Sequence, residues 1–211
     1  MLTYFGMVER RSTEDRQVEL ADAALRIIAT RGIAALTTRS LAEEVGLTTG
    51  AIFRHFASLD AVLDAVSSRV EAVLEATYPP AELPPLERLD RFIEARSAAV
   101  GARVGIFRLL LSDQFVLALP EGSAARLRKA VQKTRGFVLA CVRDGQRRGE
   151  VRADLDATAL AVVALGALQM LVLATANPAD HAAEARAVRA ALRALLTPAT
   201  PPPGAPARRR K

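Results

Sequence analysis

The fold is decided by residues 37–56, TTRSLAEEVGLTTGAIFRHF, which predict two short helices joined by a tight turn. The first half carries an apolar stripe at helical spacing, formed by Leu41, Ala42 and Val45. Gly46 follows where this helix should end, because glycine adopts the left-handed conformation after a helix without steric cost. We therefore expect a short helix that stops at this glycine.

The second half begins with Thr48, whose hydroxyl can cap a new helix. Ile52 and Phe56, four residues apart, would share the buried side of that helix. Helix, turn and helix in this order form the motif that places a second helix in a DNA major groove. An amphipathic stretch from Ser12 to Gly32 predicts a preceding helix that would close a small core with the pair.

Composition favours helices throughout the chain. The 211 residues are 51% apolar and 4% aromatic, and Ala and Leu abound while period-two strand patterns are missing. The length suggests a small N-terminal module on a larger body. The single cysteine, Cys141, excludes an internal disulfide, and no signal-peptide pattern opens the sequence. We therefore expect a cytoplasmic protein.

The formal net charge of +6 is unevenly distributed. Residues 1–80 hold 8 basic and 11 acidic side chains, a balance of −3. Residues 121–152 hold 9 basic and 3 acidic ones, and residues 208–211 add 4 more basic ones. The basic excess therefore lies outside the segment that predicts DNA binding. We interpret the charges of residues 121–152 as a solvated helix face, and we judge DNA binding from individual residues.

Downstream, apolar periodicity predicts further helices over residues 58–78, 86–99, 106–119, 120–148 and 182–196. Residues 106–119 are almost wholly apolar, which indicates an internal helix. The end of the chain, residues 198–211, is Pro-rich and basic, a composition that cannot pack into a core. We expect this segment to be a disordered tail.

Residues 157–179 contain no charged residue and are long enough to span a bilayer. Acidic residues flank the stretch at Asp154, Asp156 and Asp180, and the Lys/Arg bias and aromatic belt of a membrane anchor are missing. Polar residues and a proline also interrupt it. We therefore predict a buried helix rich in small residues and no membrane partner.

The chain resembles the N-terminal DNA-binding domain of the tetracycline-repressor (TetR) family. The resemblance rests on small, capping and aromatic residues at fixed spacing: Gly32, Leu36-Thr37, Leu41-Ala42, Gly46-Leu47-Thr48, Gly50, Phe53-Arg54-His55-Phe56 and Ser58. It implies an all-α protein of about nine helices, in which a three-helix helix-turn-helix domain precedes a helical ligand-binding and dimerisation domain. The corresponding segments are 1–57, 58–197 and the tail 198–211.

By this resemblance the protein is a homodimeric bacterial transcription factor, usually a repressor, that binds a palindromic double-stranded DNA operator. A small-molecule effector would release it from the operator. Few polar residues occur in the C-terminal helices, so we expect a mainly hydrophobic effector. No cofactor and no metal are implied. Residues 157–179 and 182–196 would supply the helix pair through which family members dimerise.

The resemblance places the DNA contacts on the helix pair, at Thr37, Arg39, Thr48, Thr49, Gly50, Ala51, Phe53, Arg54 and His55. Arg54 is the leading candidate to read guanine, and His55 to donate to a phosphate. The alternatives are a plain cap for each threonine and a solvated side chain for Arg54. Two residues depart from the family pattern: Phe53 stands where Tyr is common and Leu59 where Lys is common. Each departure removes a group that usually reaches DNA phosphates.

A ligand pocket between the C-terminal helices needs apolar walls and a few polar groups. The candidate lining residues are Phe92, Phe107, Leu110, Phe115, Phe137, Cys141, Gln169 and Met170. Ordinary core packing is the alternative for each of them. Nothing in the sequence would lower the pKa of Cys141, so inert packing is favoured over redox sensing.

Enzyme classes find little support in the sequence. The two histidines, His55 and His181, belong to no metal-ligand spacing, and no Gly-rich loop joins a strand to a helix. We expect no catalytic activity. The competing class is a helical lipid- or protein-binding module with weak or no DNA binding, in which the helix-turn-helix pattern is incidental.

Overall fold

The computed structural model of the protein describes residues 13–102, 113–174 and 178–198. Within these ranges the regular structure consists of nine α-helices and one 3-10 helix, with no strand. This confirms the all-α prediction. The chain divides into two compact units, one of residues 1–76 and 103–130 and the other of residues 77–102 and 131–211.

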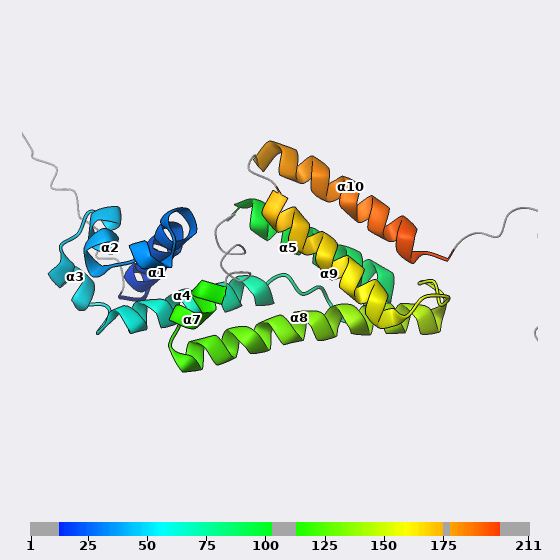
Figure 1. Cartoon of the computed structure of the whole chain (residues 1–211), viewed down its shortest axis with the longest axis horizontal. Helices are drawn as coiled ribbons and strands as arrows, with labels where there is room; N and C mark the ends of the chain where they lie inside the picture. Colours follow the sequence, from blue (N-terminus) through cyan, green and yellow to red (C-terminus); the bar gives the residue numbers. More distant parts are fainter. Residues whose placement is uncertain (1–12, 103–112, 175–177, 199–211) are drawn as a thin grey trace, which may run out of the picture. The chain divides into compact units, whose positions relative to one another are not determined.

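The first unit contains the predicted helix pair. Five helical elements form its N-terminal part: α1 (Thr13–Arg31), η1 (Ile33–Ala35), α2 (Thr38–Val45), α3 (Thr49–Phe53) and α4 (Leu59–Glu75). α1 packs against α2 and α4, and α2 packs against α3 (Figure 1). The unit also contains α7 (Asp113–Ala118) and the first turns of α8 (Glu121–Arg148).

Side-chain caps set the helix starts in this unit. The Thr37 hydroxyl accepts a hydrogen bond from the backbone N of Ser40 at 3.0 Å, and the Thr48 hydroxyl accepts one from that of Ala51 at 3.2 Å. Both predicted caps are confirmed. Gly46 ends α2 with a φ of 67°, the left-handed conformation expected at this position. The turn between α2 and α3 is therefore determined by local residues.

The core of the first unit is filled by apolar side chains of α1 to α4. Its buried residues include Leu20, Ile27, Ile28, Leu41, Ile52, Phe56 and Val66. In α7, the last complete helix of this unit, Phe115 is buried but Leu117 is 83% exposed. This part of the predicted internal helix therefore has one side open to solvent, while residues 106–112 of the same prediction lie outside the described residues.

Four helices build the second unit: α5 (Pro85–Ala102), the part of α8 after residue 130, α9 (Ala157–Ala174) and α10 (Pro178–Leu196). α5 packs against α9 and α10, which also contact each other (Figure 1). The core draws buried apolar side chains from all four helices, among them Leu89, Phe92, Val138, Val142, Ala164, Leu168 and Leu192. Removing this apolar surface from water stabilises the unit.

α9 buries only one of its sides within the described chain, although its sequence is mostly apolar and has no charged residue. Leu160, Ala164 and Leu168 are buried in the core, whereas Val162 and Val163 are 51% and 53% exposed. The expectation of a buried helix therefore holds for one side of α9 only. Among the described residues, no helix combines the length and apolarity needed to cross a membrane.

Candidate nucleic-acid interface

α3 presents one side to solvent. Thr49, Gly50 and Arg54 are exposed, Phe53 is 54% exposed, and Ile52 on the opposite side is 2% exposed. Positions 49, 50, 53 and 54 share a helix side because they are three or four residues apart. The exposed side of α3 therefore gathers four of the nine residues predicted to contact DNA.

Contacts at both ends hold α3 in place. Thr48 caps its start, and Gln17 of α1 donates from Nε2 to the carbonyl oxygen of His55 at 2.8 Å. The imidazole of His55 is half-buried, and so is Ala51. Sequence reasoning missed Gln17, because its partner is a backbone atom 38 residues away, which no local pattern can indicate.

Two further predicted contact residues lie at the start of α2. Thr37 and Ser40 form a capping box, in which the backbone N of Thr37 donates to Ser40 Oγ at 2.9 Å. Arg39 is 86% exposed on its side chain, and its Nε lies 3.0 Å from Oε1 of Glu43. Thr37 therefore caps α2, and Arg39 is solvent-exposed and paired with Glu43.

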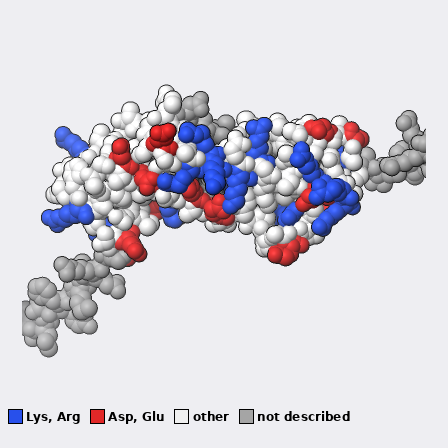
Figure 2. Space-filling model, turned by 90° about the horizontal axis from the view of Figure 1, so that it is seen from below, with Lys and Arg blue, Asp and Glu red and all other residues white. Residues whose placement is uncertain are grey.

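Most cations of the helix-turn-helix region have an acidic partner. Carboxylates of the same unit pair with five arginines: Arg16, Arg26, Arg31, Arg39 and Arg69. Arg54 has no ion pair with any residue that the structure describes. On the face drawn in Figure 2, basic and acidic side chains both lie in patches among uncharged residues. Within residues 13–76, Arg54 is thus the one cation whose charge no described acid neutralises.

Family models match both parts of the chain. Residues 20–66 match the model for bacterial regulatory proteins of the tetR family, and residues 118–191 match the one described as tetracyclin repressor-like, C-terminal domain. The chain belongs to the TetR family. The first match covers the whole helix pair, so the resemblance seen in short motifs is confirmed over a continuous segment. The protein thus has the fold of a TetR-family transcriptional regulator, with DNA-binding and ligand-binding domains.

Solved structures of other TetR-family regulators share this fold. The ketosteroid transcriptional regulator KstR2 of Mycobacterium tuberculosis has a TM-score of 0.71 at 23% identity, covering 87% of this chain and 96% of its own. PfmR from Thermus thermophilus reaches 0.68 at 23% identity, covering 88% and 96%. AibR, solved with isovaleryl coenzyme A and operator DNA, reaches 0.70 at 18% identity, covering 87% and 98%. No curated protein sequence matches the chain.

In the TetR-like second unit, two residues predicted to line a ligand pocket pack together. The ring centroids of Phe92 and Phe137 are 4.9 Å apart. The ring centroid of Tyr78 lies 5.5 Å from that of Phe92 and 5.1 Å from that of Phe137. The Cζ of buried Arg96 lies 4.8 Å from the Phe92 centroid. Sequence reasoning missed Tyr78 and Arg96, although the four-residue spacing of Phe92 and Arg96 places both on one side of α5.

Cys141 belongs to the same core as Phe92 and is 1% exposed. Burial raises the pKa of its thiol to about 11. Because the thiolate is the reactive form, a thiol that stays protonated near neutral pH is a poor nucleophile. The structure therefore favours inert packing of Cys141 over redox sensing.

The other predicted lining residues are in different places. Phe115 is buried in the first unit. Gln169 and Met170 are exposed on α9, Met170 at 58%. Phe107 and Leu110 lie outside the described residues. Of the eight residues predicted to line a ligand pocket, only Phe92 and Phe137 are therefore joined by a described ring contact.

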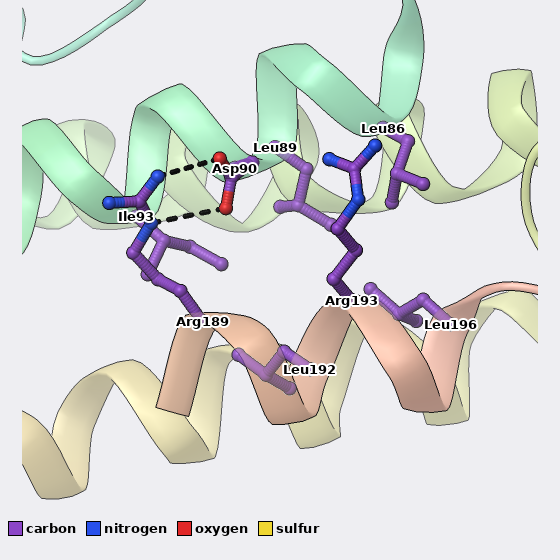
Figure 3. Close-up of a pocket in the computed structure, with 8 residues that line it drawn as sticks. All are labelled: Leu86, Leu89, Asp90, Ile93, Arg189, Leu192, Arg193 and Leu196. Atoms are coloured by element: carbon purple, nitrogen blue, oxygen red, sulfur yellow. Dashed lines mark hydrogen bonds and ion pairs between the residues drawn. The ribbon is translucent and has the colours of Figure 1, made fainter. Parts of the chain in front are cut away.

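A shallow depression lies between α5 and α10 (Figure 3). Across it, Arg189 of α10 donates to both carboxylate oxygens of Asp90 of α5, at 3.1 and 2.7 Å. The empty volume of about 220 Å³ includes open solvent, and ligand pockets commonly start at roughly 300 Å³. Its lining is Leu86, Leu89, Asp90, Ile93, Arg189, Leu192, Arg193 and Leu196. Because the depression is small and open to solvent, we assign no effector to it.

Proposed function

We propose that the protein is a homodimeric transcriptional repressor that binds a palindromic DNA operator through α3 and is released by a mainly hydrophobic small molecule. The observation that carries this proposal is the exposed side of α3. There, Gly50 has no close neighbour among the described atoms, and Arg54, four residues on, has no acidic partner among the described residues.

The part of the chain that the structure describes gives Gly50 no reason to be glycine. Gly50 is the second residue of α3, has no positive φ, and a Cβ built on it would meet no described atom within 4 Å. Glycine inside a helix costs about 1 kcal/mol relative to alanine. A close approach of a DNA backbone or base edge to the Cα of Gly50 would offset this cost. The glycine therefore supports an intermolecular contact at this position.

Arg54 supports the same interface through its charge. An arginine side chain without an acidic partner keeps its guanidinium available for a phosphate or for the O6 and N7 acceptors of guanine. Phe53 beside it is exposed and lacks the hydroxyl that family members commonly carry here. Its phenyl ring can contact a sugar or a thymine methyl but cannot donate to a phosphate.

The outward side of α9 supports a dimer. Val162, Val163 and Met170 are each more than half exposed there, and contiguous exposed apolar residues mark interaction sites. Gly166 lies on the same side at helical spacing, and a Cβ built on it would meet none of the described atoms within 4 Å. A second copy packed closely on α9 would cover this side. Gln169 is exposed on the same side of α9, so we place it in the proposed dimer interface and not in an effector pocket.

The effector part of the proposal depends on the second unit. Tyr78, Phe92 and Phe137 form a packed aromatic cluster, with Arg96 and Thr134 as polar neighbours. A ligand that entered beside this cluster would meet mainly apolar side chains. AibR, whose fold is similar, has been solved with an acyl coenzyme A and operator DNA. Release by a ligand in this unit is consistent with that architecture.

Gly50→Ala tests DNA binding independently of folding. We expect the variant to unfold at higher temperature, since alanine stabilises a helix interior by about 0.5 to 1 kcal/mol. We also expect it to bind the DNA upstream of its own gene about tenfold more weakly in gel shifts, because the added methyl group overpacks the interface.

Gly136→Ala is the matched control. Gly136 is also a helical glycine, a Cβ added to it would meet no atom within 4 Å, and it lies in the second unit. The variant should gain stability and keep DNA affinity. Unchanged DNA affinity of Gly50→Ala would remove Gly50 from the interface. If the wild-type protein retained no DNA at any salt concentration, the helical lipid- or protein-binding class would replace the repressor.

A further inference from the structure

The Arg39–Glu43 ion pair differs from most described ion pairs of the first unit in what it connects. Arg16–Glu19, within α1, is the other described pair of this unit that lies in a single helix. Arg26 and Arg31 of α1 pair with Glu44 of α2, and Arg69 of α4 pairs with Asp22 of α1. Those pairs join different helices. Arg39 and Glu43 both lie on α2, four residues apart, so their pair joins no two elements.

This pair also contributes little to the stability of α2. The two side chains are 86% and 64% exposed, and exposed pairs at this spacing contribute only about 0.3 to 0.5 kcal/mol. The arginine is nearer the positive end of the helix and the glutamate nearer the negative end, which is the less favourable order. The pair therefore has a weak structural reason to exist.

We propose that Glu43 lowers the affinity of the protein for DNA phosphates by occupying Arg39. This inference rests on the proposed DNA-binding function. Arg39 must give up or share the carboxylate at 3.0 Å before it can contact a phosphate. Glu43 thereby weakens the sequence-independent contribution of phosphate contacts to DNA binding. Contacts from the exposed side of α3 then supply a larger share of the binding free energy.

The substitution Glu43→Gln tests this, because it removes the charge and keeps the shape of the side chain. The probe is a fluorescently labelled duplex of random sequence, about 30 base pairs long, which reports the phosphate contribution without requiring a known operator. Binding is measured by anisotropy between about 50 and about 200 mM salt. Far-ultraviolet circular dichroism verifies that the helices are intact.

We expect Glu43→Gln to bind the duplex about three- to tenfold more tightly at the lowest salt concentration. The freed Arg39 should also steepen the plot of log affinity against log salt by about 0.9 for each subunit. The same substitution made in an Arg39→Gln background should produce neither effect. Glu14→Gln, which removes an exposed acid of α1, is the control for net charge.

Equal affinities of wild type and Glu43→Gln would overturn the inference. An equal gain in the Arg39→Gln background, or from Glu14→Gln, would overturn it too, because the effect would then come from net charge and not from the release of Arg39. These results leave the proposed function intact. Absence of wild-type binding at the lowest salt concentration would instead contradict the proposed function, and the inference with it.

Discussion

Ser123 at the start of α8 donates a hydrogen bond of 2.6 Å to the carboxylate of Asp64 in α4. Arg126, one turn further along α8, donates to the same oxygen at 2.7 Å and to Glu71 at 3.0 Å. These bonds fasten α8 to the helix that follows the DNA-binding pair. α8 then continues into the second unit, so these hydrogen bonds hold a helix that runs from one unit into the other.

Asp64 should make the stability of the protein sensitive to acid. The hydrogen bond from Ser123, followed by that from Arg126, holds the pKa of Asp64 below its usual value. Because the pKa of Asp64 is lower in the folded state than in the unfolded state, its carboxylate stabilises the fold at pH values above the unfolded-state pKa. This stabilisation is lost as the pH falls through the folded-state pKa. Between about pH 5 and about pH 3, the unfolding temperature should fall more for wild type than for Asp64→Asn. Parallel pH profiles in thermal melts would contradict this.

Arg54→Ala should weaken operator binding without loss of helix. If the guanidinium reads a base edge, the loss is about 1 to 3 kcal/mol, and discrimination at one operator position should relax. A footprint first locates the operator, and anisotropy then compares wild type and variant on operators altered at each position. A uniform loss across all sequences would assign Arg54 to a phosphate. Equal affinity of the two proteins would remove it from the interface.

Val163→Glu should dissociate the proposed dimer. A carboxylate placed on the outward side of α9 would be buried twice in a two-fold interface, at a cost of about 2 to 4 kcal/mol. Analytical ultracentrifugation should show a shift towards monomer and a corresponding loss of operator binding. Gln132→Glu, at an exposed position of α8, is the control and should remain dimeric. A fully dimeric Val163→Glu would place the interface elsewhere.

Cys141 should resist thiol reagents in the folded protein. Its side chain is buried and its pKa is raised to about 11, so neither access nor the thiolate form is available at pH values near 8. Labelling with iodoacetamide, followed by mass spectrometry, should be negligible in buffer and complete in denaturant. Rapid labelling of the native protein would reopen redox sensing for this residue.

The helix-turn-helix was predictable because its determinants are local. The Thr37 and Thr48 caps act on amides three residues away, and Gly46 ends α2 through its own backbone conformation. The burial of Ile52 follows from helical spacing alone. The charge count of residues 1–80 agrees with the structure in one respect: five arginines of this region pair with nearby acids.

The second unit was less predictable because its pattern is ambiguous. An apolar helix such as α9 offers no polar side from which its orientation could be read. The sequence therefore could not separate Leu168, which is buried, from Val163 and Met170, which are exposed. The same ambiguity placed Gln169 and Met170 among residues expected to line a pocket with Phe92.

What the sequence determined by itself was the helix-turn-helix, its caps and its family, because each depends on interactions within a few residues along the chain. Only the tertiary structure decided which side of α9 is exposed and which charges are paired. Gln17 reaches the His55 carbonyl across 38 residues, and Arg189 reaches Asp90 across 99. Such contacts depend on how helices pack, and packing is set by the whole core, not by any one segment.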